Sequence, residues 1–246
     1  MTMLRIGFAM LLWTAFLPAQ AAERWLGHQK ARVFIDASGR VSAVRLIDST
    51  LSDAMQTVLA ERVRRVEFEP AQLNGQAASA QVTVSIELQA TAQADALTLA
   101  VSDVAVIPGV RTAKPPRYPA RELRKGISGK VELAVKYDGD GRVTAVAPAA
   151  ADAPMDAFMQ AAMKAASNWE FEPEQVAGVG MPGGGIIPVS FSVEGESLPG
   201  ARSGDLSFPD GGVLRVNETA ESQWEIAQSQ VRLRSIEAAQ EAISGS

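Results

Sequence analysis

The sequence contains no cysteine and only one histidine, and these shortages remove most enzyme chemistries at the outset. Without cysteine, the chain cannot form a disulfide, a thiolate nucleophile or a cysteine-bound metal centre. A serine–histidine–aspartate triad would have to use His28, and a metal site with several histidines cannot be built. We therefore expect no catalytic residues, no bound metal and no small-molecule cofactor.

The chain also lacks an excess of positive charge. Its 23 basic and 28 acidic residues give a net charge of −5, and no basic stripe marks a nucleic-acid surface. Hydrophobic residues make up 47% and charged residues 21% of the chain, which is typical of a folded globular protein. A length of 246 residues favours two small domains with extensions over a single minimal domain.

Residues 1–21 have the pattern of an export signal. Arg5 precedes the apolar run Ile6–Leu17, and Ala19 and Ala21 are small residues at the positions that a signal peptidase inspects. The apolar run is shorter than the roughly 20 residues needed to span a bilayer. We predict export to the periplasm with cleavage after Ala21. An uncleaved inner-membrane anchor is the alternative.

Sequence blocks recur in the same order in the two halves of the chain. The blocks that begin at Val33, Phe68 and Val84 have counterparts that begin at Val135, Phe171 and Val189. A recurring period of this kind indicates a duplicated structural unit. We therefore predict an α+β fold with two repeats, each a small antiparallel sheet with one main helix packed on it.

The second repeat shows the elements most clearly. Apolar residues alternate over 131–137, which predicts a strand, and the Asp-Gly-Asp-Gly sequence at 138–141 predicts a turn before a second strand. Apolar residues from Met155 to Trp169 have helical spacing, with Asp152 as the expected N-cap. Residues 186–193 are expected to form the last strand. The matching elements of the first repeat are a strand at 33–35, a helix over 51–66 and a strand over 82–88.

The remaining segments are a linker and a tail. Leu97, Leu99 and Val101 alternate within the linker, so part of it is compatible with a strand. Residues 219–243 have the spacing of one long helix, which either packs on its own chain or forms a homodimeric coiled coil. The expected domains are a signal (1–21), a first repeat (22–90), a linker (91–113), a second repeat (114–195), and a loop with a C-terminal helix (196–246).

The second repeat resembles the C-terminal domain of the TonB energy-transducer family. The resemblance rests on short motifs in the family's order: Pro116-Arg117-Tyr118-Pro119, Gly129-Lys130-Val131, Asp140-Gly141-Arg142-Val143, Trp169-Glu170-Phe171-Glu172-Pro173 and Ile187-Pro188-Val189-Ser190-Phe191. The first repeat keeps Phe68-Glu69-Pro70 and looks like a degenerate copy of the same domain.

The resemblance implies a periplasmic domain that binds other envelope proteins, outer-membrane receptors among them, by adding a partner strand to the edge of its sheet. In this family the last strand is the pairing edge. Pro188 independently suggests an edge, because proline cannot donate a hydrogen bond to a neighbouring strand. The expected partner-binding residues are Arg117, Tyr118, Ile186, Ile187, Val189 and Phe191. For Tyr118, packing of the ring on the sheet is the alternative to a partner contact.

These patterns predict a non-enzymatic protein that takes part in or modulates TonB-dependent transport across the outer membrane. The alternative is a structural or assembly adaptor of the cell envelope that reuses the fold without transducing energy and holds its partners on the tail. Neither interpretation involves nucleic acid.

Overall fold

The computed structural model describes residues 23–93, 96–193, 203–207, 213–217, 225–226, 229, 231–240 and 243–244, so the predicted export signal lies outside the described residues. In chain order the elements are β1 (Glu23–Ile35), β2 (Val41–Ile47), α1 (Asp53–Val63), β3 (Glu67–Phe68), β4 (Ala71–Leu73), β5 (Gln76–Ala78), β6 (Ala80–Gln93), β7 (Ala96–Ile107), β8 (Gly109–Thr112), α2 (Ala120–Arg124), β9 (Gly129–Tyr137), β10 (Val143–Pro148), α3 (Ala157–Ala166), β11 (Glu170–Glu172), β12 (Gln175–Val176), β13 (Val179–Gly180), β14 (Gly183–Phe191), β15 (Ser203–Ser207), β16 (Val213–Asn217), β17 (Glu225–Ile226), β18 (Leu233–Ser235), the 3-10 turn η2 (Glu237–Ala239) and β19 (Ile243–Ser244).

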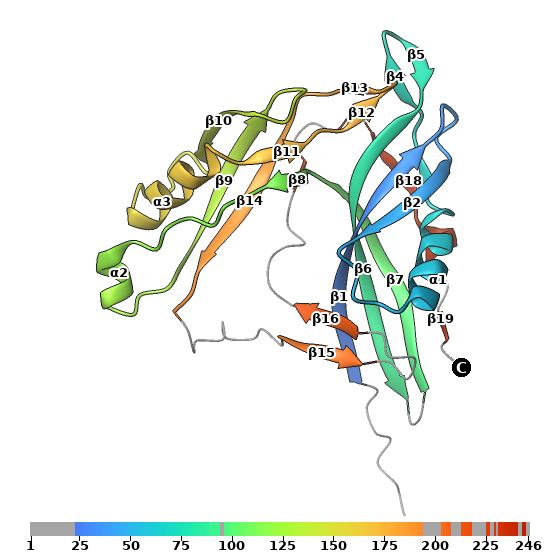
Figure 1. The fold of residues 1–246 in the computed structure, drawn as a ribbon, viewed down its shortest axis with the longest axis horizontal. Helices are drawn as coiled ribbons and strands as arrows, with labels where there is room; N and C mark the ends of the chain where they lie inside the picture. The colour runs from blue at the N-terminus through green and yellow to red at the C-terminus, as the bar shows by residue number, and fades with distance from the viewer. Residues whose placement is uncertain are drawn as a thin grey trace, which may run out of the picture.

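Two antiparallel sheets dominate the structure, in agreement with the predicted α+β class (Figure 1). The first sheet has the strand order β13-β12-β6-β1-β2, and β7 pairs with β6 and β19 with β7. The second sheet has the order β10-β9-β14-β17. The sub-orders β2-β1-β6 and β10-β9-β14 place the corresponding predicted strands in the same positions. Most of the predicted linker is strand β7, as the alternation at Leu99 and Val101 allowed.

The strands β1, β2 and β6 with helix α1 are called the first unit below, and the strands β9, β10 and β14 with helix α3 the second unit. The turn after the first strand of each unit makes the same hydrogen bonds. Asp36 Oδ1 accepts from the backbone N–H groups two and four residues on, at 2.8 and 3.1 Å. Asp138 Oδ1 accepts from the equivalent groups at 3.0 and 2.8 Å. Gly39 and Gly141 follow with φ of +87° and +88°, and their carbonyls accept from the backbone N–H groups of Phe68 and Phe171, respectively. The sequence signal at these turns therefore reflects a specific backbone geometry.

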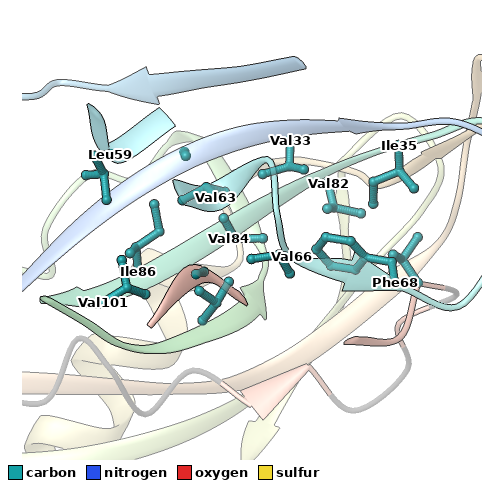
Figure 2. Close-up of a cluster of buried hydrophobic side chains, with 14 of the residues drawn as sticks. Val33, Ile35, Leu59, Val63, Val66, Phe68, Val82, Val84, Ile86 and Val101 are labelled. Carbon is teal, nitrogen blue, oxygen red and sulfur yellow. The ribbon is translucent and has the colours of Figure 1, made fainter. Parts of the chain in front are cut away.

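Each unit has its own apolar core. Figure 2 shows that the first core gathers Val33, Ile35, Val82, Val84 and Ile86 against Leu59 and Val63 of α1. The second core lies between α3 and the strands β9 and β14, with Leu133, Ala162 and Phe171 almost fully buried. Burial of each large apolar side chain stabilises the fold by roughly 1.5–3 kcal/mol, so both helices are held by packing rather than by helix propensity alone.

Two details of the second unit differ from the sequence prediction. Helix α3 is capped by Asp156 rather than Asp152, because the Asp156 carboxylate accepts from the Met159 N–H at 2.8 Å. The strand predicted to begin at Ile186 begins at Gly183. A Cβ on Gly183 would lie 2.6 Å from the Tyr137 hydroxyl oxygen, so glycine permits the close pairing that extends β14.

The predicted C-terminal helix over residues 219–243 is wrong. The described residues in this range form β17, β18 and η2, and β19 follows at its end. Val231 and Ala239 are 1% and 0% exposed and belong to the first core, so this part of the tail packs on that core. A homodimer through a C-terminal helix therefore has no structural basis in the described part of the tail.

The second unit is joined to the first sheet by its β12–β13 hairpin. Strand β12 pairs with the start of β6, through Val176 opposite Ala80, and Val176 is fully buried in the first core. The Arg32 guanidinium also forms an ion pair with the carboxylate of Glu172, the last residue of β11. The two units thus share a sheet and a core side chain.

We predict that Gly141→Ala destabilises the protein far more than Gly178→Ala. Both glycines have positive φ, but an added Cβ would lie 2.0 Å from the Phe171 carbonyl oxygen at Gly141 and meets nothing within 4 Å at Gly178. The conformational cost of about 1–2 kcal/mol applies to both variants. The clash at Gly141 raises the loss there to roughly 3–5 kcal/mol. Urea denaturation measures the two changes in the free energy of unfolding. Equal losses would show that the contact with Phe171 is not required.

Candidate functional site

Strand β14 has one edge that is fully paired and another that is partly open. On its inner side it pairs with β9 along its whole length, from Gly183 to Phe191. On its outer side it meets β17 at only two positions, Gly185 opposite Ile226 and Ile186 opposite Glu225. From residue 187 to residue 191, no described strand pairs with the outer side. This stretch, called the open edge below, is the candidate site.

The backbone groups of the open edge follow from the position of Pro188. In an antiparallel strand, the N–H and C=O of one residue point to the same side, and the side alternates along the strand. Proline is tolerated where its missing N–H would face away from the partner strand, so the backbone of Pro188 faces outward. The outward groups are then the C=O of Pro188 and both the N–H and the C=O of Ser190. The backbones of Ile187 and Val189 face β9.

The side chains of the open edge divide between the two faces of the sheet. Ile187, Val189 and Phe191 are 2%, 7% and 4% exposed and point into the second core. Ile186 and Pro188 are half-buried on the opposite face, and Ser190 is exposed there. Three of the predicted partner-binding side chains therefore pack in the core, and the groups open to a partner strand are backbone groups of the intervening residues Pro188 and Ser190.

Tyr118 is a packing residue at one end of β14. Its hydroxyl donates to the Ile127 carbonyl at 2.7 Å, and its ring lies edge-on to Phe158 and Phe191, with centroids 5.8 and 5.6 Å away. The segment before Tyr118 is fixed as well, since the Trp169 indole N–H donates to the Lys114 carbonyl at 2.9 Å. These contacts favour the packing interpretation of Tyr118. Arg117 next to it is exposed.

The corresponding edge of the first sheet is closed. Strand β6 occupies there the place that β14 has in the second sheet, and β1 pairs with its inner side. The outer side of β6 is covered by β7 from Thr83 onward and by β12 at Ala80 and Gln81. An incoming strand could not reach this edge without displacing part of the chain.

The described residues include titratable groups with shifted pKa values, Asp36 and Tyr137. No group of three or more potential metal ligands occurs in the described part of the chain. Hydrogen bonds from the Ser38 hydroxyl and from the backbone N–H groups of Arg40 and Ser38 lower the pKa of Asp36. Burial, with a contribution from Glu174, raises the pKa of Tyr137 to about 12. His28 is half-buried in β1, away from the open edge.

The net charge of the whole chain does not show a local concentration of basic residues around α2. Between Asp103 and Glu132 the chain carries seven basic residues and one acidic residue, Glu122. A local charge count along the sequence would have found this segment. Whether these basic side chains are exposed depends on the fold, which leaves all seven of them exposed.

Residues 114–193 match the family model described as the Gram-negative bacterial TonB protein C-terminal domain. The second unit is therefore a TonB C-terminal domain, as its motifs indicated. This domain is a non-enzymatic, periplasmic protein-interaction domain whose family members contact outer-membrane receptors and other envelope proteins. No curated protein matched the chain. No helix in the described ranges is both long and apolar enough to cross a membrane.

The buried phenol of Tyr137 predicts a loss of stability at high pH. Because the folded-state pKa is raised above the ordinary value of 10, its contribution is complete below pH 10 and is lost as the pH rises to about 12. The loss amounts to at most about 3 kcal/mol. We expect Tyr137→Phe to be less sensitive to pH between 10 and 12 in denaturant titrations. An identical pH dependence in the variant and the wild type would contradict this assignment.

Proposed function

We propose that this protein binds envelope partners in the periplasm by accepting a partner strand along the open edge of β14, and that it thereby takes part in or modulates TonB-dependent transport. The observation that carries the proposal is the absence of a described partner strand beside residues 187–191 of the TonB C-terminal domain. Exposed strand edges are suited to strand addition, because the backbone supplies the hydrogen bonds and the neighbouring side chains supply specificity.

The open edge favours weak and reversible binding of a partner strand. Only the outward groups of Pro188 and Ser190 are available, and each backbone hydrogen bond contributes about 0.5–1.5 kcal/mol net. A longer partner strand would have to displace β17 from Gly185 and Ile186. Affinity beyond these bonds would come from side chains of the partner on the exposed face at Ser190. Reversible binding suits a protein that must release its receptor.

We further propose that the first unit is a degenerate copy of the same domain and serves as a support rather than a second binding site. The matching strand order, the shared turn hydrogen bonds and the equivalent Phe-Glu-Pro segments support a duplication. Since β7 and β12 already occupy the edge of β6, this copy has no equivalent open edge.

The adaptor hypothesis placed its partners on a tail helix. The described tail residues instead pair with β3, β7 and β14, and Val231 and Ala239 lie in the first core. This tail therefore has a folding role, and we do not propose it as the partner-binding element. Export by residues 1–21 remains part of the proposal.

A substitution at Ser190 tests strand addition without disturbing the core. Ser190→Pro removes the outward N–H and fills the space in front of it, whereas Ser190→Ala keeps the backbone donor. We expect Ser190→Pro to lower the recovery of outer-membrane proteins from a Gram-negative envelope extract at least about fivefold, since it removes a main-chain donor and blocks the edge.

Ser190→Ala is the matched control and should recover the same proteins as the wild type. Near-ultraviolet circular dichroism of both variants checks that the fold is retained. Ser190 is exposed, so this pair is more informative than a charged residue at Ile187, which would disrupt the core. Undiminished recovery by a folded Ser190→Pro variant would refute binding at the open edge.

A further inference from the structure

A basic and apolar surface surrounds α2, at the end of the second sheet remote from the first (Figure 1). We define the α2 patch as the following exposed residues: Arg117, Arg121, Leu123, Arg124, Lys125 and Ile127. The only acidic residue of the segment, Glu122, is half-buried. Among the described residues, none of the four basic side chains of the patch has an ion-pair partner.

The two apolar residues of the α2 patch are exposed to solvent on a hydrogen-bonded turn. Leu123 and Ile127 are 49% and 44% exposed. The helix ends with two crossed hydrogen bonds, from the Gly126 N–H to the Leu123 carbonyl and from the Ile127 N–H to the Glu122 carbonyl, at 3.1 and 3.0 Å. This is a Schellman ending, with Gly126 at a φ of +64°. The Tyr118 hydroxyl donates to the Ile127 carbonyl, and Tyr118 packs against the second core, so the turn is connected to that core.

We propose that the α2 patch docks the protein on the surface of an anionic phospholipid bilayer. Basic side chains are attracted to an anionic surface, and exposed leucine and isoleucine among them can enter the interface between headgroups and acyl chains. The remainder of the chain carries a net negative charge, so it is repelled by the same surface and the protein is oriented with α2 toward the lipid.

A bilayer fits this surface better than an acidic peptide does. The patch is built on a five-residue helix and a tight turn at the end of the domain, and among the described residues the patch itself contains no strand with which an extended peptide could pair. A flat lipid surface needs only a protruding group of cations and apolar side chains. The inference is independent of strand addition, although it would bring the Phe191 end of β14 close to the membrane through Tyr118.

The absence of cysteine makes a local test possible in the full-length chain. A cysteine introduced as Ile127→Cys carries an environment-sensitive fluorophore and reports insertion at the patch. Val179→Cys in β13 is the matched control, because Val179 is a comparably exposed apolar residue, 51% exposed, at another place on the surface. The probe is a unilamellar vesicle of phosphatidylcholine with or without phosphatidylglycerol.

We expect the fluorophore at position 127 to shift to the blue with phosphatidylglycerol vesicles and not with neutral ones, and the fluorophore at position 179 to shift with neither. Adding Arg121→Glu and Arg124→Glu should weaken the titration at least about tenfold, from the contribution of each basic side chain near an anionic surface. Arg45→Glu with Lys164→Glu makes the same change in net charge at exposed sites elsewhere and should leave the titration within about twofold.

Three results would overturn the proposal. One is no blue shift at position 127 with anionic vesicles, and another is an equal shift at positions 127 and 179. The third is a response at position 127 to soluble polyglutamate but not to vesicles, which would assign the patch to an acidic protein partner instead.

Discussion

The arrangement of this protein depends on the requirement that backbone N–H and C=O groups of a strand find hydrogen-bond partners. Both sheets contain a three-strand unit of the same order. Each unit ends in a strand, β6 or β14, whose outer side needs hydrogen-bond partners. In the first unit the chain satisfies that side itself, by folding β7 and β12 against β6. In the second unit it leaves the outer side of β14 without a described partner strand from residue 187 to residue 191. We therefore propose the first unit, whose edge is closed, as a support, and the open edge of β14 as the binding site for a partner strand.

The sequence predicted the parts of the fold that local physics determines. Alternation of apolar residues predicted β9 and β6, and helical spacing predicted α1 and α3. The Asp-Gly-Asp-Gly sequence at 138–141 predicted a turn, and the structure builds it with the same hydrogen bonds as the turn after Asp36. Pro188 predicted an edge strand because of its missing donor, whereas β17 pairs with β14 at Gly185 and Ile186, so the outer side of β14 lacks a described partner strand only beyond those residues. The motifs of the second unit also identified its family correctly.

The errors concern contacts between residues distant in sequence. The tail has apolar residues at helical spacing, but Val231 and Ala239 are used to cover the first core, and that demand is not visible in the tail itself. The partner-binding prediction for Ile187, Val189 and Phe191 followed from their position on the strand and stays a prediction, although the pleat turns these side chains inward. Only the fold shows which edge the chain closes, and only the fold shows that Leu123 and Ile127 remain exposed among basic residues.

Amide hydrogen exchange of the free protein, resolved by residue with NMR, tests the open edge most directly. The account predicts rapid exchange of the Ser190 N–H and slow exchange of the Ile187 and Val189 N–H groups, which face β9. The amides of β6 from Thr83 to Ala90 should be slow on both sides of the strand, because that strand is paired on both edges. Protection of Ser190 equal to that of Val189 would show that the edge is already occupied and would contradict the account.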